Sequence, residues 1–248
     1  MRAVSDTPPT QLAPALAAEG WALVRAGDLL DWIETSAAEL APLVATWDAL
    51  PTDPHLRDGG HYRARRHASF LVDPGGEVTR APHRAHFQPV QYNALHGGIE
   101  RWFSPISVEV AEHPAWLRLL ARMGAELARV TPVPRWFVEA HQFRVDTEGG
   151  IGRPTPEGAH RDGVDFVVVV VLRRHHIKGG ETRVFEADGP NGVRFTLNEP
   201  WSTLVLDDRR VIHESTPIQP AGEHGHRDTL VLTYRAGGFQ EAGSSPRS

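Results

Sequence analysis

The sequence predicts an α+β protein in which helices come first and a jelly-roll barrel of antiparallel strands follows. Three observations support this fold class. Apolar residues recur at helical spacing before Pro134, short runs rich in Val, Phe, Thr and Leu follow it, and turn clusters separate those runs. The chain has 248 residues, which is long enough to bury one substantial core.

The first part of the chain predicts an arm, a short strand and a helical region. Residues 1–15 are rich in Pro, Thr and Ala, which is typical of a flexible arm. Residues 20–24 fit a short strand. Asp28 stands where a helix N-cap is expected, and the apolar spacing behind it predicts one or two helices over about 28–49.

The middle of the chain predicts an extended segment and a long helix, and the strands follow. Residues 62–72 are polar and Arg-rich and fit an extended segment. Over about 107–129 the apolar side chains fall on one helical stripe, which Pro132 and Pro134 close. The runs after this helix predict strands at residues 136–145, 165–172, 181–186, 193–197, 202–206 and 229–235.

No linker separates the helical half from the strands, so the sequence predicts a single domain over residues 16–240. Within it, we expect residues 16–134 to supply mainly helical support and a lid. Residues 135–236 would form the barrel core. The Gly- and Ser-rich end, residues 241–248, predicts a disordered tail.

The composition excludes several classes of function. Because the chain has no cysteine, thiolate metal sites and cysteine nucleophiles are excluded, and any metal must be held by His, Asp or Glu. The 26 basic against 31 acidic residues argue against a nucleic-acid partner. The longest apolar run, residues 166–172, is far shorter than the ~20 residues of a membrane helix. We therefore expect a cytoplasmic protein without a membrane partner, and no oligomeric state is predicted.

The strongest functional pattern is His160-Arg-Asp162, followed by His213 from a later strand. Alternate residues of an extended segment point to the same side, so His160 and Asp162 can bind one ion together. Two imidazoles and one carboxylate on one face of an octahedron leave three positions open, which is typical of non-haem Fe(II). A His-x-Asp pattern alone is weak in a chain with 14 histidines, and a turn between Gly158 and Gly163 is the simpler explanation of it.

Arg227 makes the pattern much more specific. It opens the strand that follows His213. A guanidinium there can pair with the distal carboxylate of 2-oxoglutarate through two parallel hydrogen bonds, which a lysine could not form. The order of His-x-Asp, strands, His and then Arg therefore predicts an iron site that uses a 2-oxoacid.

Five segments also carry a family resemblance. They are residues 139–144 (EAHQFR), 158–163 (GAHRDG), 179–182 (GGET), 204–218 (LVLDD to HESTPI) and 226–234 (HRDTLVLTY), with a fainter contribution from 88–101. Through them the C-terminal half resembles the Fe(II)/2-oxoglutarate-dependent dioxygenases, whose core is a double-stranded β-helix. Within these it is similar to the bacterial "2OG-Fe dioxygenase" family, which contains free L-isoleucine hydroxylases and related amino-acid oxygenases.

The resemblance implies a concrete chemistry. His160, Asp162 and His213 would be ligands of Fe(II), and Arg227 would anchor 2-oxoglutarate. With O₂, such a site oxidises an unactivated C–H bond and releases succinate and CO₂. The substrate would be a small molecule, namely a free L-amino acid or a close derivative. Hydroxylation is the expected ending, with oxidative cyclisation or desaturation left open. Halogenation requires the carboxylate ligand to be missing, so the presence of Asp162 disfavours it.

The strand at 136–145 offers two faces for the substrate. Gln142 and Arg144 lie on one face, while Glu139 and His141 lie on the other, and one face should line the barrel mouth. For an amino-acid substrate we expect Arg144 to bind the α-carboxylate and an acid such as Asp165 to bind the ammonium. A structural salt bridge would explain either residue equally well.

Further polar residues are predicted as lid or pocket residues, because N-terminal segments often cover such barrel mouths. They are Tyr62 and Arg65, with Arg63, Gln88, Tyr92 and Asn93. Solvated loop side chains would explain them too. The histidines of three close pairs are assigned to the surface: His83 and His86, His175 and His176, and His224 and His226. Asp208 is expected to orient His213 or Arg227.

Two other classes of function stay open. A cupin-like, metal-dependent hydrolase or isomerase would use the same three ligands, but it would need no Arg227 and would consume no 2-oxoglutarate. A non-catalytic β-barrel binding module would be unaffected when His160 or His213 becomes Ala. The position of Arg227 favours the oxygenase over both.

Overall fold

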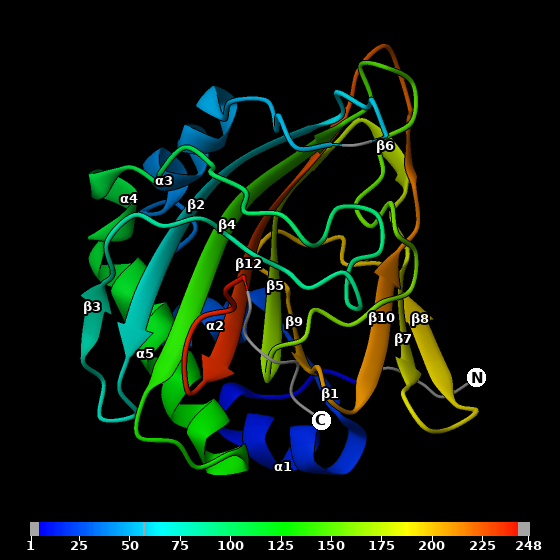
Figure 1. Ribbon diagram of the computed structural model, residues 1–248. Coiled ribbons are helices and arrows are strands. Elements are labelled where there is room, and N and C mark those ends of the chain that lie inside the picture. The colour runs from blue at the N-terminus through cyan, green and yellow to red at the C-terminus, as the bar shows by residue number, and fades with distance from the viewer. Residues whose placement is uncertain (1–4, 57, 243–248) are drawn as a thin grey trace.

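A seven-stranded sheet and a three-stranded sheet face each other in the computed structural model, which describes residues 5–56 and 58–242 (Figure 1). The large sheet contains, in spatial order, β1 (Trp21–Val24), β9 (Thr203–Asp207), β5 (Phe166–His175), β12 (His226–Ala236), β4 (Trp136–Asp146), β2 (Arg63–Val72) and β3 (Val78–Arg80). The small sheet contains β10 (Val211–Ser215), β7 (Thr182–Glu186) and β8 (Gly192–Phe195). A two-stranded pair joins β11 (Ile218–Pro220) to β6 (Ile177–Gly179).

The helices lie on the outer face of the large sheet, away from the small one (Figure 1). They are the 3₁₀ turns η1 (Pro9–Gln11) and η2 (Thr46–Ala49), and the helices α1 (Leu12–Glu19), α2 (Ala26–Trp32), α3 (Ala41–Ala45), α4 (Val108–Ala111) and α5 (Pro114–Val130). No helix in the described part of the chain is long and apolar enough to cross a lipid bilayer.

Strand β5 shows how the large sheet divides two cores. Its even-numbered residues, including Phe166 and Val168, pack against the helices in the larger apolar cluster. Its odd-numbered residues Val167 and Val171 belong to a smaller cluster, which also contains Leu204 of β9 and residues of the small sheet. Because successive side chains of a strand point to opposite faces, the odd positions of β5 face the space between the sheets.

The predicted fold class is confirmed. The chain is largely antiparallel β-structure in a jelly-roll arrangement with flanking helices, and each run predicted as a strand after residue 134 contains one. The helix expected over about 107–129 forms as α4 and α5, which Glu112 and His113 separate. The short strands β3, β6 and β11 are additions that their brief polar sequences did not predict.

The N-terminal segment differs from the expected flexible arm. From Pro9 onward it is helical, and Leu12 and Leu16 of α1 are fully buried in the larger core. These two residues are one helical turn apart, so they present one apolar stripe to the sheet. Asp28 is not an N-cap either, because α2 begins after Arg25 and Asp28 lies in its first turn. A carboxylate there still favours the helix through the macrodipole.

Residues 16–134 supply strands as well as helices. Strands β1, β2 and β3 of this region belong to the large sheet, and β2 pairs with β4 along its whole length. The barrel therefore extends beyond the expected 135–236 segment. An Arg-rich strand can occupy this position because Arg63 and Arg65 line a polar cavity rather than an apolar core. Of the expected disordered tail, residues 243–248 lie outside the described residues.

Candidate active site

A cavity of about 150 Å³ lies between the two sheets. Its floor consists of odd-numbered residues of β2, β4 and β12, since directly paired residues of antiparallel strands point to the same face. Arg65, Phe143 and Thr229 form one such row across the three strands. His141 and Val231 belong to the next row. The register of three strands, distant in sequence, therefore determines which side chains meet in the cavity.

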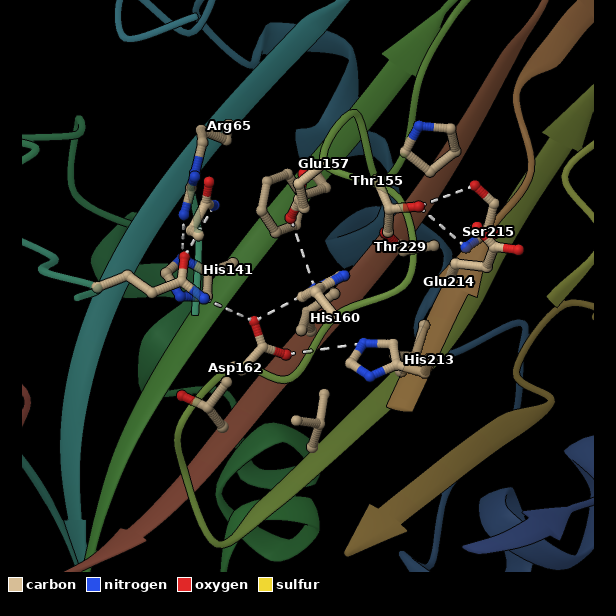
Figure 2. Close-up of a pocket in the computed structure, with 18 of the residues that line it drawn as sticks. Arg65, His141, Thr155, Glu157, His160, Asp162, His213, Glu214, Ser215 and Thr229 are labelled. Atoms are coloured by element: carbon tan, nitrogen blue, oxygen red, sulfur yellow. Dashed lines mark hydrogen bonds and ion pairs between the residues drawn. The ribbon is translucent and has the colours of Figure 1, made fainter. Parts of the chain in front are cut away.

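The cavity contains the metal triad, by which we mean His160, Asp162 and His213. Their ligand atoms all lie within 4.8 Å of one another. Asp162 lies between the two imidazoles, with one carboxylate oxygen 3.7 Å from His160 Nε2 and the other 3.7 Å from His213 Nε2 (Figure 2). Two backbone hydrogen bonds of 3.0 Å, His160 N–H to His213 O and the reverse, join the loop to β10. These two bonds hold the backbones of His160 and His213 next to each other.

Surrounding groups orient His160 and Asp162. His160 Nδ1 lies 2.9 Å from the Gly158 carbonyl and donates to it, which leaves Nε2 free to bind a metal. Gln88 Nε2 donates to Asp162 Oδ1 over 3.1 Å. Gly163 follows with φ of 77°, and a Cβ there would overlap the ring of Tyr92. Only glycine fits this turn without strain.

Asp208 holds the loop that carries Asp162. Its carboxylate accepts hydrogen bonds from the backbone N–H groups of Asp162, Gly163 and Val164, over 2.9, 2.7 and 3.1 Å. Burial and the negative charge of Asp162 raise the pKa of Asp208 to about 7. The expectation that Asp208 orients His213 or Arg227 is wrong. Because it follows the end of β9, it reaches the neighbouring loop instead.

The charges of the triad favour a cation. Burial would raise the pKa of Asp162, but the hydrogen bond and charge of His160 hold it well below its usual range. Burial opposes charge on His160, yet Asp162, with Glu157 beside it, raises the pKa of His160 to about 10. Burial and the charge of His160 lower the pKa of His213 to about 4. A divalent cation would replace the proton that the two carboxylates hold on His160, so these residues fit a bound metal.

Arg227 is a buried cation without an anionic partner. It lines the cavity, and its Nη1 donates to Ser215 Oγ over 2.9 Å, while its Nε has no partner. Among the described residues no carboxylate lies within ion-pair distance of it. Burial and the charge of Arg174 lower its pKa to about 10, so it stays protonated at neutral pH. Ser215 lies two residues beyond His213 on β10, about 7 Å along the strand. Arg227 and the triad therefore lie close together in one cavity.

Of the predicted substrate residues, Arg65 lines the cavity, whereas Gln142 and Arg144 do not. Arg144 pairs with Asp228 over 2.7 Å, and Gln142 Nε2 donates to the Thr46 hydroxyl. Both residues are at even positions of β4, so they face the helices rather than the cavity. The assignment of these two residues to the substrate is therefore wrong. The opposite face of β4 is the one that lines the cavity.

Asp165 and Tyr62 also lie outside the cavity lining. Asp165 Oδ2 accepts a hydrogen bond of 2.7 Å from the Ala236 backbone N–H. The hydroxyl of Tyr62 donates to Asp58 over 2.7 Å, and its ring packs on Ile218. Because Asp165 lies at the start of β5, it bonds to the end of the adjacent strand β12. Neither residue is therefore in position to bind a substrate beside the triad.

A histidine cluster, consisting of His67, His86 and His141, forms the wall beside Arg65. Glu139 accepts hydrogen bonds from His67 Nε2 and His86 Nδ1 over 3.1 and 3.2 Å, while a guanidinium N–H of Arg65 lies 2.7 Å from His141 Nδ1. The three rings offer ligand atoms within 4.8 Å, like a metal site. The Arg65 charge disfavours a second dication there. Burial lowers the pKa of all three histidines, so they are neutral hydrogen-bonding groups.

This cluster corrects the assignment of His86 to the surface. His86 is buried and lines the cavity, whereas His175, His176 and His224 are exposed as expected. Gln88 and Asn93, predicted as pocket residues, do line the cavity. His86 lies in a loop, where side chains follow no helical or strand periodicity. The sequence therefore could not indicate that His86 is buried.

Arg101 and Glu157 are cavity residues that sequence reasoning missed. Arg101 lies in the loop between β3 and α4, and Glu157 precedes the His-x-Asp motif by three residues. Glu157 Oε1 lies 3.5 Å from His160 Nε2. The nearest sequence indication was the faint family resemblance of residues 88–101, which ends at Arg101. Glu157 had no indication, because its loop has no regular structure.

A jelly roll that holds a His-x-Asp motif, a distal His and a buried Arg within one cavity defines a class, the Fe(II)/2-oxoglutarate-dependent oxygenases. The sequence model of the 2OG-Fe dioxygenase family matches residues 44–233, and the chain belongs to this family. It is therefore an Fe(II)- and 2-oxoglutarate-dependent dioxygenase with O₂ as co-substrate. This membership excludes the hydrolase and the non-catalytic module as alternatives.

Solved structures agree with this assignment. A BsmA homologue from Methylobium petroleophilum PM1 is 48% identical over 98% of this chain and 97% of that chain, with a TM-score of 0.90. IDO from Bacillus thuringiensis is 17% identical over 96% and 100%, with a TM-score of 0.77. The Fe(II)/α-ketoglutarate-dependent dioxygenase TqaL is 20% identical over 96% and 90%, with a TM-score of 0.72. The last two show the shared fold alone. A search of curated proteins found no match.

Proposed function

We propose that this dioxygenase hydroxylates an unactivated C–H bond of a free L-amino acid or a close derivative, and releases succinate and CO₂. One observation carries the proposal. The cavity that contains the triad is small and carries charges of both signs, with the buried Arg65 and Arg101 as cations and the buried Glu139 and partly buried Glu157 as anions. Such a cavity favours a small zwitterion over an uncharged or macromolecular substrate.

Each side chain of the metal site has a defined task in this proposal. The triad holds iron, which when bound supplies the redox chemistry that activates O₂ and allows an inert C–H bond to be broken. Gln88 keeps one oxygen of Asp162 engaged, so the carboxylate orientation is defined before the metal binds. Asp208 fixes the backbone of the same loop. Arg227 and the Ser215 hydroxyl bind the distal carboxylate of 2-oxoglutarate.

Apolar side chains supply the remaining wall. Val167, Val169, Leu204 and Val231 project into the cavity from three adjacent strands of the large sheet. They exclude water from the region beside the triad and hold a hydrocarbon side chain without offering it a polar partner. With no cysteine in the chain, no thiol competes with the substrate for oxidation. These features fit the oxidation of an aliphatic carbon.

The test combines the anaerobic protein with Fe(II), 2-oxoglutarate and a panel of free L-amino acids, then admits O₂. Succinate release and product mass are measured. We expect one or a few amino acids to stimulate succinate formation and to gain the mass of one oxygen atom. A loss of two hydrogens instead would indicate desaturation or cyclisation. If no amino acid stimulates succinate formation above the substrate-free rate, the proposed substrate class is wrong.

A matched pair of variants shows whether the triad carries this activity. His213→Ala should abolish substrate-dependent succinate formation, because it removes one of three metal ligands. His175→Ala changes an exposed histidine of β5 and should leave the rate unchanged. Equal rates in the two variants would contradict the assignment of the triad.

A further inference from the structure

Arg101 is a buried cation with little compensation inside the protein. Its side chain lines the cavity, and the residue is only 2% exposed. One Nη donates to Gln88 Oε1 over a long 3.4 Å, and Nε has no partner. Among the described residues no carboxylate lies within ion-pair distance of it. An unpaired buried charge is costly, so an anionic ligand at this position would offset a cost that the folded protein already bears.

Arg65 adds a second positive charge on the same wall. The guanidinium carbons of Arg65 and Arg101 lie 3.7 and 6.0 Å from the centroid of the Phe103 ring, so the ring lies against both. Arg65 Nε also has no partner, and its nearest carboxylate, Asp53, lies 3.9 Å away and is bound more closely by Arg63. Two cations with unpartnered N–H groups on one cavity wall suit a carboxylate ligand.

Glu157 provides the complementary charge closer to the triad. One of its oxygens lies 3.5 Å from His160 Nε2, and the other is buried without a hydrogen-bond partner. The cavity therefore contains unsatisfied donors near Phe103 and an unsatisfied acceptor beside the metal site. An α-amino acid carries the two matching charges on one carbon atom.

We propose that Arg101, with Arg65 beside it, binds the α-carboxylate of the substrate and that Glu157 binds its ammonium group. The inference rests on the proposed function, and it assigns to these three residues the roles that Arg144 and Asp165 cannot fill. It also joins recognition to the metal site. Gln88 accepts a hydrogen bond from Arg101 and donates one to Asp162, so two hydrogen bonds separate the carboxylate anchor from a metal ligand.

The test measures binding by calorimetry to the anaerobic protein loaded with Fe(II) and 2-oxoglutarate. The probes are the twenty standard L-amino acids, then the best binder with its decarboxylated amine and its des-amino acid. We expect Arg101→Met to weaken binding of the amino acid and of the des-amino acid by about 10- to 150-fold, because both carry the carboxylate. Binding of the amine, which has no carboxylate, should change very little. Glu157→Gln should weaken the amino acid and the amine, but not the des-amino acid.

Two further variants control for folding. Arg66→Met changes the next residue of β2, whose guanidinium bonds to the Pro105 and Ala49 carbonyls outside the cavity, and should bind all probes like the wild type. Arg101→Lys keeps the charge but loses the paired N–H donors of the guanidinium. It should weaken binding of the amino acid by about tenfold, which is less than the effect of Arg101→Met. Affinity for 2-oxoglutarate should be unchanged in each variant.

The outcomes separate this assignment from the proposed function. If the wild type binds an amino acid and Arg101→Met or Arg101→Lys binds it equally well, the anchor is wrong while the proposed function stands. An equal loss of amine and amino acid in Arg101→Met would also overturn the anchor. If the wild type binds none of the amino acids, the proposed function fails and this assignment fails with it.

Discussion

Arg227 and Arg101 are buried arginines that line the same cavity. Neither of them forms an ion pair with a carboxylate of the described residues. Removing a charge from water costs several kcal/mol when nothing compensates it. The protein retains two such charges on its cavity wall, and we propose that each of them binds one carboxylate of a ligand. The distal carboxylate of 2-oxoglutarate suits Arg227, which shares a hydrogen bond with the strand of His213. The remaining cation is then available to the substrate.

Replacing Arg227 tests the first of these pairings. Arg227→Met should weaken 2-oxoglutarate binding by about 10- to 150-fold, because hydrogen bonds to a charged group contribute roughly 1.5–3 kcal/mol. Binding of Fe(II) alone should not change, since Arg227 contacts no triad residue. Titration of the anaerobic Fe(II) protein with 2-oxoglutarate, followed by visible absorption, measures the first affinity, and calorimetry measures Fe(II) binding. The control Arg183→Met alters a half-exposed arginine of β7 and should have no effect. Wild-type affinity in Arg227→Met would contradict the role of Arg227.

The histidine cluster should make folding sensitive to acid. Burial lowers the pKa of His86 to about 4, from an ordinary value of 6.5. The unfolded chain takes up this proton below pH 6.5 while the folded protein does not. The free energy of unfolding is therefore fully retained above pH 6.5 and falls as the pH drops toward 4, by up to about 1.4 kcal/mol per pH unit for one histidine.

Urea unfolding at about pH 7 and about pH 5 measures this effect. The loss of stability between the two pH values should be smaller in His86→Gln than in the wild type, by the contribution of one proton. The exposed His175→Gln should behave like the wild type. If His86→Gln shows the same loss as the wild type, His86 is not held neutral in the folded state.

At single positions, the sequence predicted the metal triad better than the substrate residues. His160, Asp162 and His213 share a local spacing and a chain order that the metal chemistry requires. Whether Arg144 or His141 lines the cavity depends on which face of β4 points toward the cavity. That face follows from the register with β2 and β12, and a single strand in isolation cannot reveal it.

The Asp208 carboxylate holds residues 162–164, which lie in a loop without regular structure. Asp208→Asn would leave at least one of its three backbone N–H groups without an acceptor of equal strength. We expect Fe(II) affinity to fall by about 10- to 100-fold, the usual effect of removing a group that orients metal ligands. Calorimetry of Fe(II) binding measures it. The adjacent Asp207→Asn, whose carboxylate accepts from Arg209 N–H, should change it far less. Equal effects would contradict the role of Asp208.

Helix α1 should contribute strongly to stability, although its sequence resembles an arm. Leu16→Ala removes a fully buried side chain and should lower the free energy of unfolding by about 2–5 kcal/mol. Gln11→Ala changes an exposed neighbour and should shift it by less than about 0.5 kcal/mol. Urea unfolding of both variants compares them. A loss below about 1 kcal/mol in Leu16→Ala would show that α1 is dispensable to the core.

For strand β2, the sequence predicted the extended conformation but not the position of the strand in the fold. The extended conformation of residues 62–72 was predicted, but its polar composition suggested a lid. In the structure the strand lies within the large sheet, between β4 and β3. Arg63 and Arg65 face the cavity, while Phe70 and Val72 face the helical core. A buried polar cavity inverts the usual rule that buried strands are apolar. The sequence of one strand contains no information about such a cavity.

In the whole molecule, the active site depends on contributions from both halves of the chain. The second half supplies the metal triad and Arg227, while β2 and the loop between β3 and α4 supply Arg65, Gln88 and Arg101. The jelly roll was predictable because its strands are short, apolar and separated by clear turns. The contribution of the first half was not, since it depends on pairing between residues that are more than 70 positions apart, such as His67 and His141.

The central claim is that one cavity holds iron at the metal triad and 2-oxoglutarate between that iron and Arg227. Crystals prepared without O₂, with Fe(II) and 2-oxoglutarate, test it most directly through anomalous scattering at the iron edge. The account predicts an iron peak within coordination distance of all three triad side chains, and 2-oxoglutarate with its distal carboxylate on Arg227. An iron peak in the histidine cluster instead, or 2-oxoglutarate bound away from Arg227, would contradict it.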